Sequence, residues 1–151
     1  MNRSMLLGLA AFALSTAAMV ASADEAIPDI KGKWVGPSQS IIAGRGAHWP
    51  TSLGNFAKPA LGEKEVTLHI AGQEGRRFWG VTTLTGGGEK TSEPFVGMLS
   101  GNDNRTVLIA DTDGYFNGQL SDNDTVAYCY AHAGGKTKTS VVACGELKHE
   151  R

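Results

Sequence analysis

TVAYCYAHAGGKTKTSVVACGEL, residues 125–147, is the stretch of sequence that most clearly indicates the fold. Its two halves, 125–132 and 139–147, flank a polar segment that contains two glycines. Large and small side chains alternate in the first half, as in a strand with one buried face. The large ones are Val126, Tyr128, Tyr130 and His132. The stretch therefore predicts an antiparallel hairpin.

The two cysteines of the chain both lie in this hairpin. Cys129 and Cys144 are each between seven and eight residues from its centre, between Lys136 and Thr137. That symmetry places them opposite each other, and we predict a disulfide that stabilises the fold by about 3 kcal/mol. Two buried free thiols or a redox pair are the alternatives, and no Cys-x-x-Cys spacing supports either.

Similar short runs continue towards the N-terminus. Gly, Asn and Asp clusters separate them, and the connections after residue 65 are too short for parallel crossovers. We predict an all-β domain, an eight-stranded antiparallel up-and-down β-barrel that closes on itself and so removes its edges. Residues 44–64 form a long insertion, in which 49–61 can hold a short turn. The predicted strands are 31–35 with a continuation through 40–43, 65–70, 78–85, 94–100, 105–111, 115–120, 125–132 and 139–147.

The N-terminus has the pattern of a signal peptide. Arg3 is followed by an uncharged apolar stretch at 5–20 and by small residues at 21–23. We predict cleavage after Ala23, which leaves a single domain at 24–151 in the periplasm or secreted. A retained membrane anchor is the alternative, but the stretch is short and rich in Ala. No second apolar run can cross a membrane, so we expect no membrane span in the mature chain.

Charge and histidine spacing argue against several functions. Without residues 1–23 the chain has 13 basic and 15 acidic residues, a formal charge of −2, which disfavours nucleic acid as a partner. The four histidines are far apart in the sequence, and Asp111 to Tyr115 is better explained as a tight turn than as a calcium loop. We expect no metal site and no cofactor.

Short motifs on successive predicted strands resemble those of calycin-type barrels, the group that includes lipocalins and avidins. The likeness is closer to avidins, and it implies an eight-stranded barrel with room for one small ligand. The motifs are Gly32-x-Trp34 with Ile41-Ile42, Phe78-x-Gly80, Pro94-Phe95-x-Gly97 and Phe116-Asn117-Gly118-Gln119. The segment GPSQS at 36–40, and Tyr128 and Tyr130 in place of tryptophan, depart from the residues that hold biotin in avidins. We therefore do not expect biotin as the ligand.

No residues indicate a catalytic mechanism, so we expect a non-enzymatic binding protein with a small ligand at the mouth or interior of the barrel. The candidate contacts are Trp79, Tyr128, Tyr130 and His132 inside, with His48 and Trp49 in a mouth loop. A satisfied core around the tyrosines, and a lid formed by Trp49, are the structural explanations of the same residues. Trp34 is expected to plug the barrel floor. The alternative function is a protein-interaction module, or an inhibitor of a secreted enzyme, that acts through the barrel loops.

Overall fold

A computed structural model describes residues 26–46, 49–134 and 139–151, except for the side chains of 45, 46, 49–53, 133 and 134. All regular structure in these residues is β-strand. The strands are β1 (Gly32–Gly46), β2 (Trp49–Gly54), β3 (Ala60–Glu74), β4 (Arg77–Gly86), β5 (Glu89–Ser100), β6 (Thr106–Ala110), β7 (Tyr115–Leu120), β8 (Thr125–Gly134) and β9 (Thr139–Glu150).

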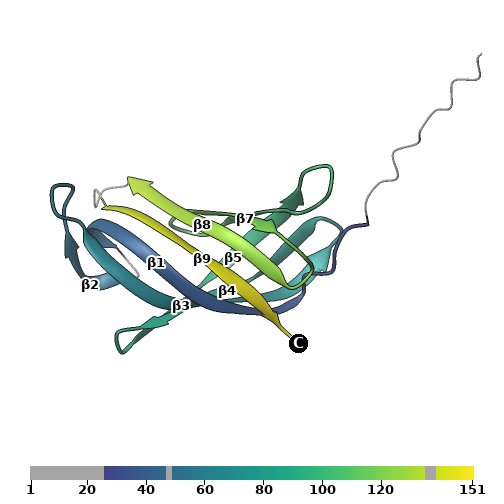
Figure 1. The fold of residues 1–151 in the computed structure, drawn as a ribbon, viewed down its shortest axis with the longest axis horizontal. Coiled ribbons are helices and arrows are strands. Elements are labelled where there is room, and N and C mark those ends of the chain that lie inside the picture. The colour runs from purple at the N-terminus through teal and green to yellow at the C-terminus, as the bar shows by residue number, and fades with distance from the viewer. Residues whose placement is uncertain (1–25, 47–48, 135–138) are drawn as a thin grey trace, which may run out of the picture.

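Eight of these strands close into a barrel. The sheet order is β2-β1-β3-β4-β5-β6-β7-β8-β9, and the additional pairing of β1 with β9 completes the cylinder (Figure 1). Every neighbouring pair is antiparallel, so the chain runs up and down around the barrel. The predicted all-β, eight-stranded antiparallel barrel is confirmed.

The strands are strongly staggered. The register offset can be measured by starting at Leu61 of β3 and stepping from each residue to its partner on the next strand. After one circuit of all eight strands this path returns to β3 at Gly72, so the offset is eleven residues (61 to 72). Such a stagger accompanies strands that are tilted against the barrel axis, and an eight-stranded barrel is just wide enough for side chains or one small ligand. The space inside is therefore limited.

The long insertion predicted at 44–64 is partly regular structure. β1 continues to Gly46 and β3 already begins at Ala60, and between them β2 pairs with the end of β1. The turn after β2 is held by two backbone hydrogen bonds between Asn55 and Lys58. The turn lies within 49–61, where a short turn was expected, but β2 was not predicted, because a strand that overhangs the barrel satisfies its backbone groups by pairing without a regular apolar pattern.

Apolar side chains fill the end of the barrel at which β3–β4, β5–β6 and β7–β8 are connected, which we call the apolar end. The segment before β1 folds across it: the backbone N–H of Ile30 donates to Oε1 of Gln73 at 2.9 Å. Trp34 is 2% exposed, and its indole N–H donates to the Ile30 carbonyl at 2.9 Å. The His149 ring stacks on Trp34 with a centroid distance of 4.5 Å. Trp34 thus plugs the barrel floor, as predicted.

Glycine makes room for the large rings of this core. A Cβ atom at Gly97 of β5 would collide with the ring of Phe78, which is 1% exposed on the neighbouring strand β4. The two residues are direct register partners, so only a residue without a side chain leaves space for the ring.

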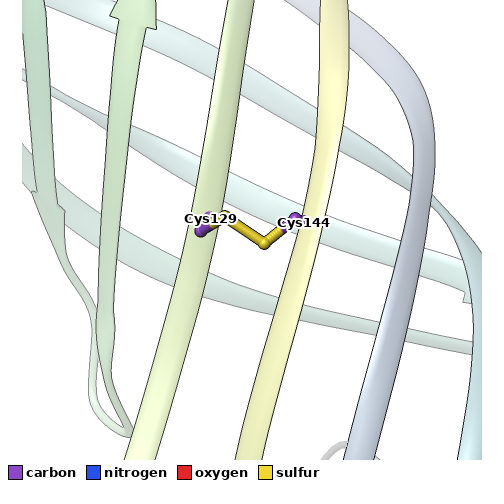
Figure 2. Close-up of a disulfide and its surroundings, with 2 residues drawn as sticks. All are labelled: Cys129 and Cys144. Atoms are coloured by element: carbon purple, nitrogen blue, oxygen red, sulfur yellow. A yellow bond between two sulfur atoms is a disulfide. The ribbon is translucent and has the colours of Figure 1, made fainter.

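The predicted disulfide joins β8 to β9. Cys129 and Cys144 are direct register partners with a Cα–Cα distance of 4.1 Å, and their sulfur atoms are bonded (Figure 2). Both residues are exposed, because they alternate with inward residues such as Tyr128. The bond therefore staples the outer surface of the barrel wall and takes no space in the core. A disulfide is consistent with an oxidising, exported compartment.

Candidate functional site

The character of the barrel interior changes from one end to the other. Along the inner face of β5, Leu99 and Phe95 are followed by Glu93, and along β8 Val126 is followed by Tyr128 and Tyr130. The polar residues lie towards the end at which β4–β5, β6–β7 and β8–β9 are connected, which we call the polar end. Polar groups inside a barrel are costly unless they are partnered, so this end is the candidate site.

Asp111 belongs both to a turn and to the interior. It follows β6, and its Oδ1 accepts hydrogen bonds from the backbone N–H groups of Asp113 at 2.9 Å and Gly114 at 2.6 Å. The same oxygen accepts a hydrogen bond from the Tyr130 hydroxyl at 3.3 Å. No hydrogen bond to Oδ2 of Asp111 occurs within the described residues. The turn predicted for 111–115 therefore holds a carboxylate at the inner wall.

A second carboxylate lies close by on β5. Glu93 is 9% exposed, and its Oε2 accepts a hydrogen bond from the Thr112 hydroxyl at 3.1 Å. Burial raises the pKa of Asp111, the hydrogen bonds from Gly114 and Asp113 lower it, and the Glu93 charge raises it further. The polar end thus concentrates negative charge on two neighbouring acids.

Two tyrosines of β8, Tyr128 and Tyr130, line the same cavity as Asp111. Burial raises the pKa of Tyr130, and the negative charges of Asp111 and Glu93 raise it further. Burial also raises the pKa of Tyr128, an effect that the Ser38 hydroxyl partly opposes. Both phenols therefore stay protonated and can donate a hydrogen bond at neutral pH.

Tyr128 is more deeply buried than Glu93, Asp111 and Tyr130. It is 6% exposed, and its ring stacks on Phe116 with centroids 4.4 Å apart. The Ser38 hydroxyl lies near enough to act on the Tyr128 hydroxyl, but no described residue meets the geometry of a hydrogen bond to it. A buried hydroxyl without a partner costs about 1–3 kcal/mol, so a polar group that enters beside it would be stabilised by a hydrogen bond.

A partly open cavity of about 40 Å³ is lined by Tyr128. Its polar lining comes from Asp111, Tyr128 and Tyr130 with two further hydroxyls, Ser38 and Thr82. Its apolar lining consists of Val66, Leu68, Ile109, Phe116 and Ala143. A site for a water molecule needs about 10–15 Å³, so the cavity can hold a group of a few non-hydrogen atoms. We call Ser38, Thr82, Asp111, Tyr128 and Tyr130 the inner cluster.

The structure brings only some of the predicted contacts together. Tyr128 and Tyr130 belong to the inner cluster, while His132 lies one step further along the same face, partly buried and with Nε2 lacking a hydrogen bond to any described residue. Trp79 lies on the outer face, 48% exposed, because the inward residues of β4 are its neighbours Phe78 and Gly80. It therefore does not contact an internal ligand.

The predicted mouth contacts are largely outside the described structure. His48 lies outside the described residues. Trp49 begins β2, so its backbone is in a strand rather than an irregular loop, and its side chain is not described.

Asp111 and Glu93 were not among the predicted site residues. Asp111 was explained by turn chemistry alone, and Glu93 precedes the predicted strand 94–100. The available signal was alternation, because Asp111 continues the inward series of Val107 and Ile109.

Among the described residues no group of three or more His, Cys, Asp or Glu side chains has a metal-binding arrangement. No described helix is long and apolar enough to cross a membrane.

A second hollow lies on the outside of the barrel. It has a volume of about 860 Å³ over β4, β5, β6 and β7, and apolar side chains dominate its lining. The exposed ones are Trp79, Val96, Met98, Leu108 and Tyr115. Contiguous exposed apolar surface of this kind often marks an interaction site. We call this region the outer hollow.

Comparisons with known proteins do not place the chain in a family. No family model matches the sequence, and no curated protein matches it. Two chains among the solved structures match. One is a redesigned β-barrel, with 9% sequence identity and a TM-score of 0.47 over 81% of this chain and 92% of that chain. The resemblance to avidins and lipocalins therefore stays a prediction, and the structure defines the class as a closed eight-stranded β-barrel.

Proposed function

We propose that this protein is an exported, non-enzymatic binding protein that holds a small polar group in the inner cluster. The proposal rests mainly on the state of the Tyr128 hydroxyl. This hydroxyl is buried, lacks a hydrogen-bond partner among the described residues and belongs to a residue that lines the 40 Å³ cavity. A bound group that hydrogen-bonds to Tyr128 would remove the cost of the unpartnered hydroxyl. The disulfide supports an oxidising compartment, and we propose the periplasm.

The size of the cavity restricts the ligand. Sites for drug-sized molecules have volumes of about 300–1,000 Å³, far above the 40 Å³ beside Tyr128. The enclosed part of the ligand is therefore a head group or a very small molecule, which also argues against biotin. The rest of the inward-facing space towards the apolar end is filled by packed side chains.

Native mass spectrometry of protein taken directly from its compartment tests this function. We expect an adduct on the wild-type chain that is depleted about tenfold in Tyr130→Phe and Asp111→Asn, since one charge-assisted hydrogen bond contributes roughly 1.5–3 kcal/mol. Tyr115→Phe and Glu146→Gln are matched controls, because both side chains are exposed outside the barrel. A bare mass for the wild-type protein, or an adduct equally retained by all four variants, would contradict the proposal.

The outer hollow favours a second candidate function, self-association. A second copy is the proposed occupant because the border of the hollow carries complementary charges, Glu74 and Arg77, whose side chains lie 3.2 Å apart and are mostly exposed. A two-fold axis through the hollow would set Arg77 of one copy against Glu74 of the other, as an isologous interface requires. The apolar centre would be covered at the same time.

Sedimentation velocity tests self-association. We expect a wild-type dimer at micromolar concentration, and a monomer for Val96→Lys, which places a charge at the centre of the outer hollow. Val142→Lys is the control, because Val142 is comparably exposed on β9 and does not line the hollow. A monomeric wild-type protein at 100 µM, or dimers of both variants, would refute this second function.

A further inference from the structure

We infer that the group held by the inner cluster is a protonated amine, so that the ligand is a small ammonium ion or a molecule with an ammonium head. This inference rests on the proposed function and names its ligand class. It starts from the hydrogen-bonding capacity of the cavity lining. Asp111 can only accept when ionised, and the hydroxyls of Ser38, Thr82, Tyr128 and Tyr130 can all accept. Among the residues whose side chains the structure describes, no lysine, arginine or amide side chain lines the cavity.

The carboxylate has capacity for a further donor. Oδ1 of Asp111 already accepts three hydrogen bonds, from Asp113, Gly114 and Tyr130, whereas Oδ2 accepts none from the described residues. An ammonium group has three donors, which matches an acceptor set of one carboxylate oxygen and nearby hydroxyls. The unpartnered Tyr128 hydroxyl has a free acceptor site as well as its donor.

The electrostatic surroundings also favour a cation. Glu93 adds a second buried carboxylate, and its charge acts on both Asp111 and Tyr130. At the same end of the barrel, Lys64 pairs with Glu89 at 3.3 Å. A positive charge in the cavity would therefore be attracted by the Asp111 carboxylate and by the Glu93 charge that acts on it.

Aromatic rings in the cavity lining also favour an ammonium group as the ligand. Phe116 and Tyr128 stack at 4.4 Å, and both line the cavity together with Tyr130. The faces of aromatic rings attract ammonium groups, with a larger effect at desolvated sites. A carboxylate and hydroxyl acceptors, with aromatic rings around them, favour a cation over a neutral or anionic group of equal size.

Methylammonium is the probe, because its two non-hydrogen atoms suit a 40 Å³ cavity. So small a ligand can reach a Kd no tighter than the millimolar range, given a ceiling of about 1.5 kcal/mol per non-hydrogen atom. The full mature chain is therefore titrated to about 100 mM at pH 7.5. Backbone amide NMR shifts of Asp113 and Gly114 report on the site, since both amides donate to Asp111.

Three further ligands isolate the chemistry. Methanol has the same number of non-hydrogen atoms without the charge, formate reverses the charge, and tetramethylammonium supplies the charge in an ion too large for the cavity and without donors. We expect saturable shifts with methylammonium alone, and a Kd raised at least tenfold in Asp111→Asn but unchanged in Glu146→Gln. Asparagine keeps an oxygen for the turn amides, so the variant is expected to fold.

The outcomes separate this inference from the proposed function. Saturable binding of methanol or formate at the same amides would contradict the inference that the ligand is a protonated amine, and so would an uncharged adduct from the native compartment. Either result would still support a ligand site at the inner cluster. Equal methylammonium affinity in Asp111→Asn would also overturn the amine. No saturable shift with any probe, together with a bare native mass, would remove both the amine and the proposed function.

Discussion

The Tyr130 hydroxyl donates a 3.3 Å hydrogen bond to Oδ1 of Asp111, and this bond connects β8 to the turn between β6 and β7. The same oxygen is the acceptor for the turn amides of Asp113 and Gly114. One carboxylate therefore shapes a turn of the barrel and also supplies charge to the inner cluster. Substitutions of Asp111 can separate these two roles.

Asp111→Asn is expected to unfold with a free energy equal to or higher than that of the wild type at pH 7, whereas Asp111→Ala loses about 1–2 kcal/mol. Asparagine keeps the acceptor for the turn amides and removes a charge whose burial raises the pKa of Asp111, while alanine removes both. Urea unfolding measures the difference. Equal losses in the two variants would show that the turn hydrogen bonds do not depend on an oxygen at this position.

Alkaline pH is expected to destabilise the barrel. The pKa values of Tyr128 and Tyr130 are raised in the folded protein, first of all by burial, so the folded state holds protons that the unfolded state releases above its ordinary tyrosine pKa of 10.0. Stability is therefore fully present below pH 10 and falls as the pH rises above it, by up to about 1.4 kcal/mol per pH unit for each phenol.

Urea midpoints between pH 8 and 11.5 measure this slope. Tyr130→Phe is expected to make the slope smaller, and Tyr115→Phe, which removes an exposed phenol outside the barrel, serves as the control. A wild-type midpoint that stays constant up to pH 11.5 would show that the inner phenols ionise without cost.

Removal of the disulfide is expected to cost about 3 kcal/mol without loss of the fold, because the bond closes a loop of 15 residues and lies on the outer face. The double variant Cys129→Ser with Cys144→Ser should keep the far-ultraviolet circular dichroism of the wild type and unfold at lower urea. Intact mass after alkylation without reductant provides the direct control: the wild-type mass should not change. Two alkylated thiols would reject the disulfide.

Trp34→Ala is expected to cost about 3–5 kcal/mol, since it empties the centre of the apolar end and removes the hydrogen bond to Ile30. Trp79→Ala removes a residue of the same type from the outer face and should cost at most about 1 kcal/mol. Chemical denaturation of the two variants measures the contrast. A loss for Trp79→Ala as large as that for Trp34→Ala would place Trp79 in the core.

The sequence predicts the barrel well because strand alternation and turn composition are local properties. The hairpin of 125–147 could be aligned about its centre, and Cys129 and Cys144 are register partners in the structure. The strand β2 escaped prediction because its pairing with the end of β1 follows from the overhang of β1 beyond the barrel, which no local pattern encodes.

The candidate site could be predicted only in part. Tyr128 and Tyr130 share a face through simple alternation, so both were recognised. The orientation of Trp79 could not be predicted, because Trp79 stands next to Phe78 and either ring could occupy the core. In the structure Gly97 lies opposite Phe78 and leaves space for the Phe78 ring, so Phe78 is the inward residue. Asp111 could be placed inside only if it was known which face of β6 points into the barrel. That depends on closure of the whole barrel.

A high-resolution crystal structure of the protein, purified from its native compartment without added amines, tests the central claim most directly. We expect electron density for a bound group between the Tyr128 hydroxyl and Oδ2 of Asp111, within hydrogen-bonding distance of both. A cavity at the polar end closed by rearranged side chains, with the Tyr128 hydroxyl bonded to protein and no bound group beside it, would contradict the claim that this barrel holds a ligand.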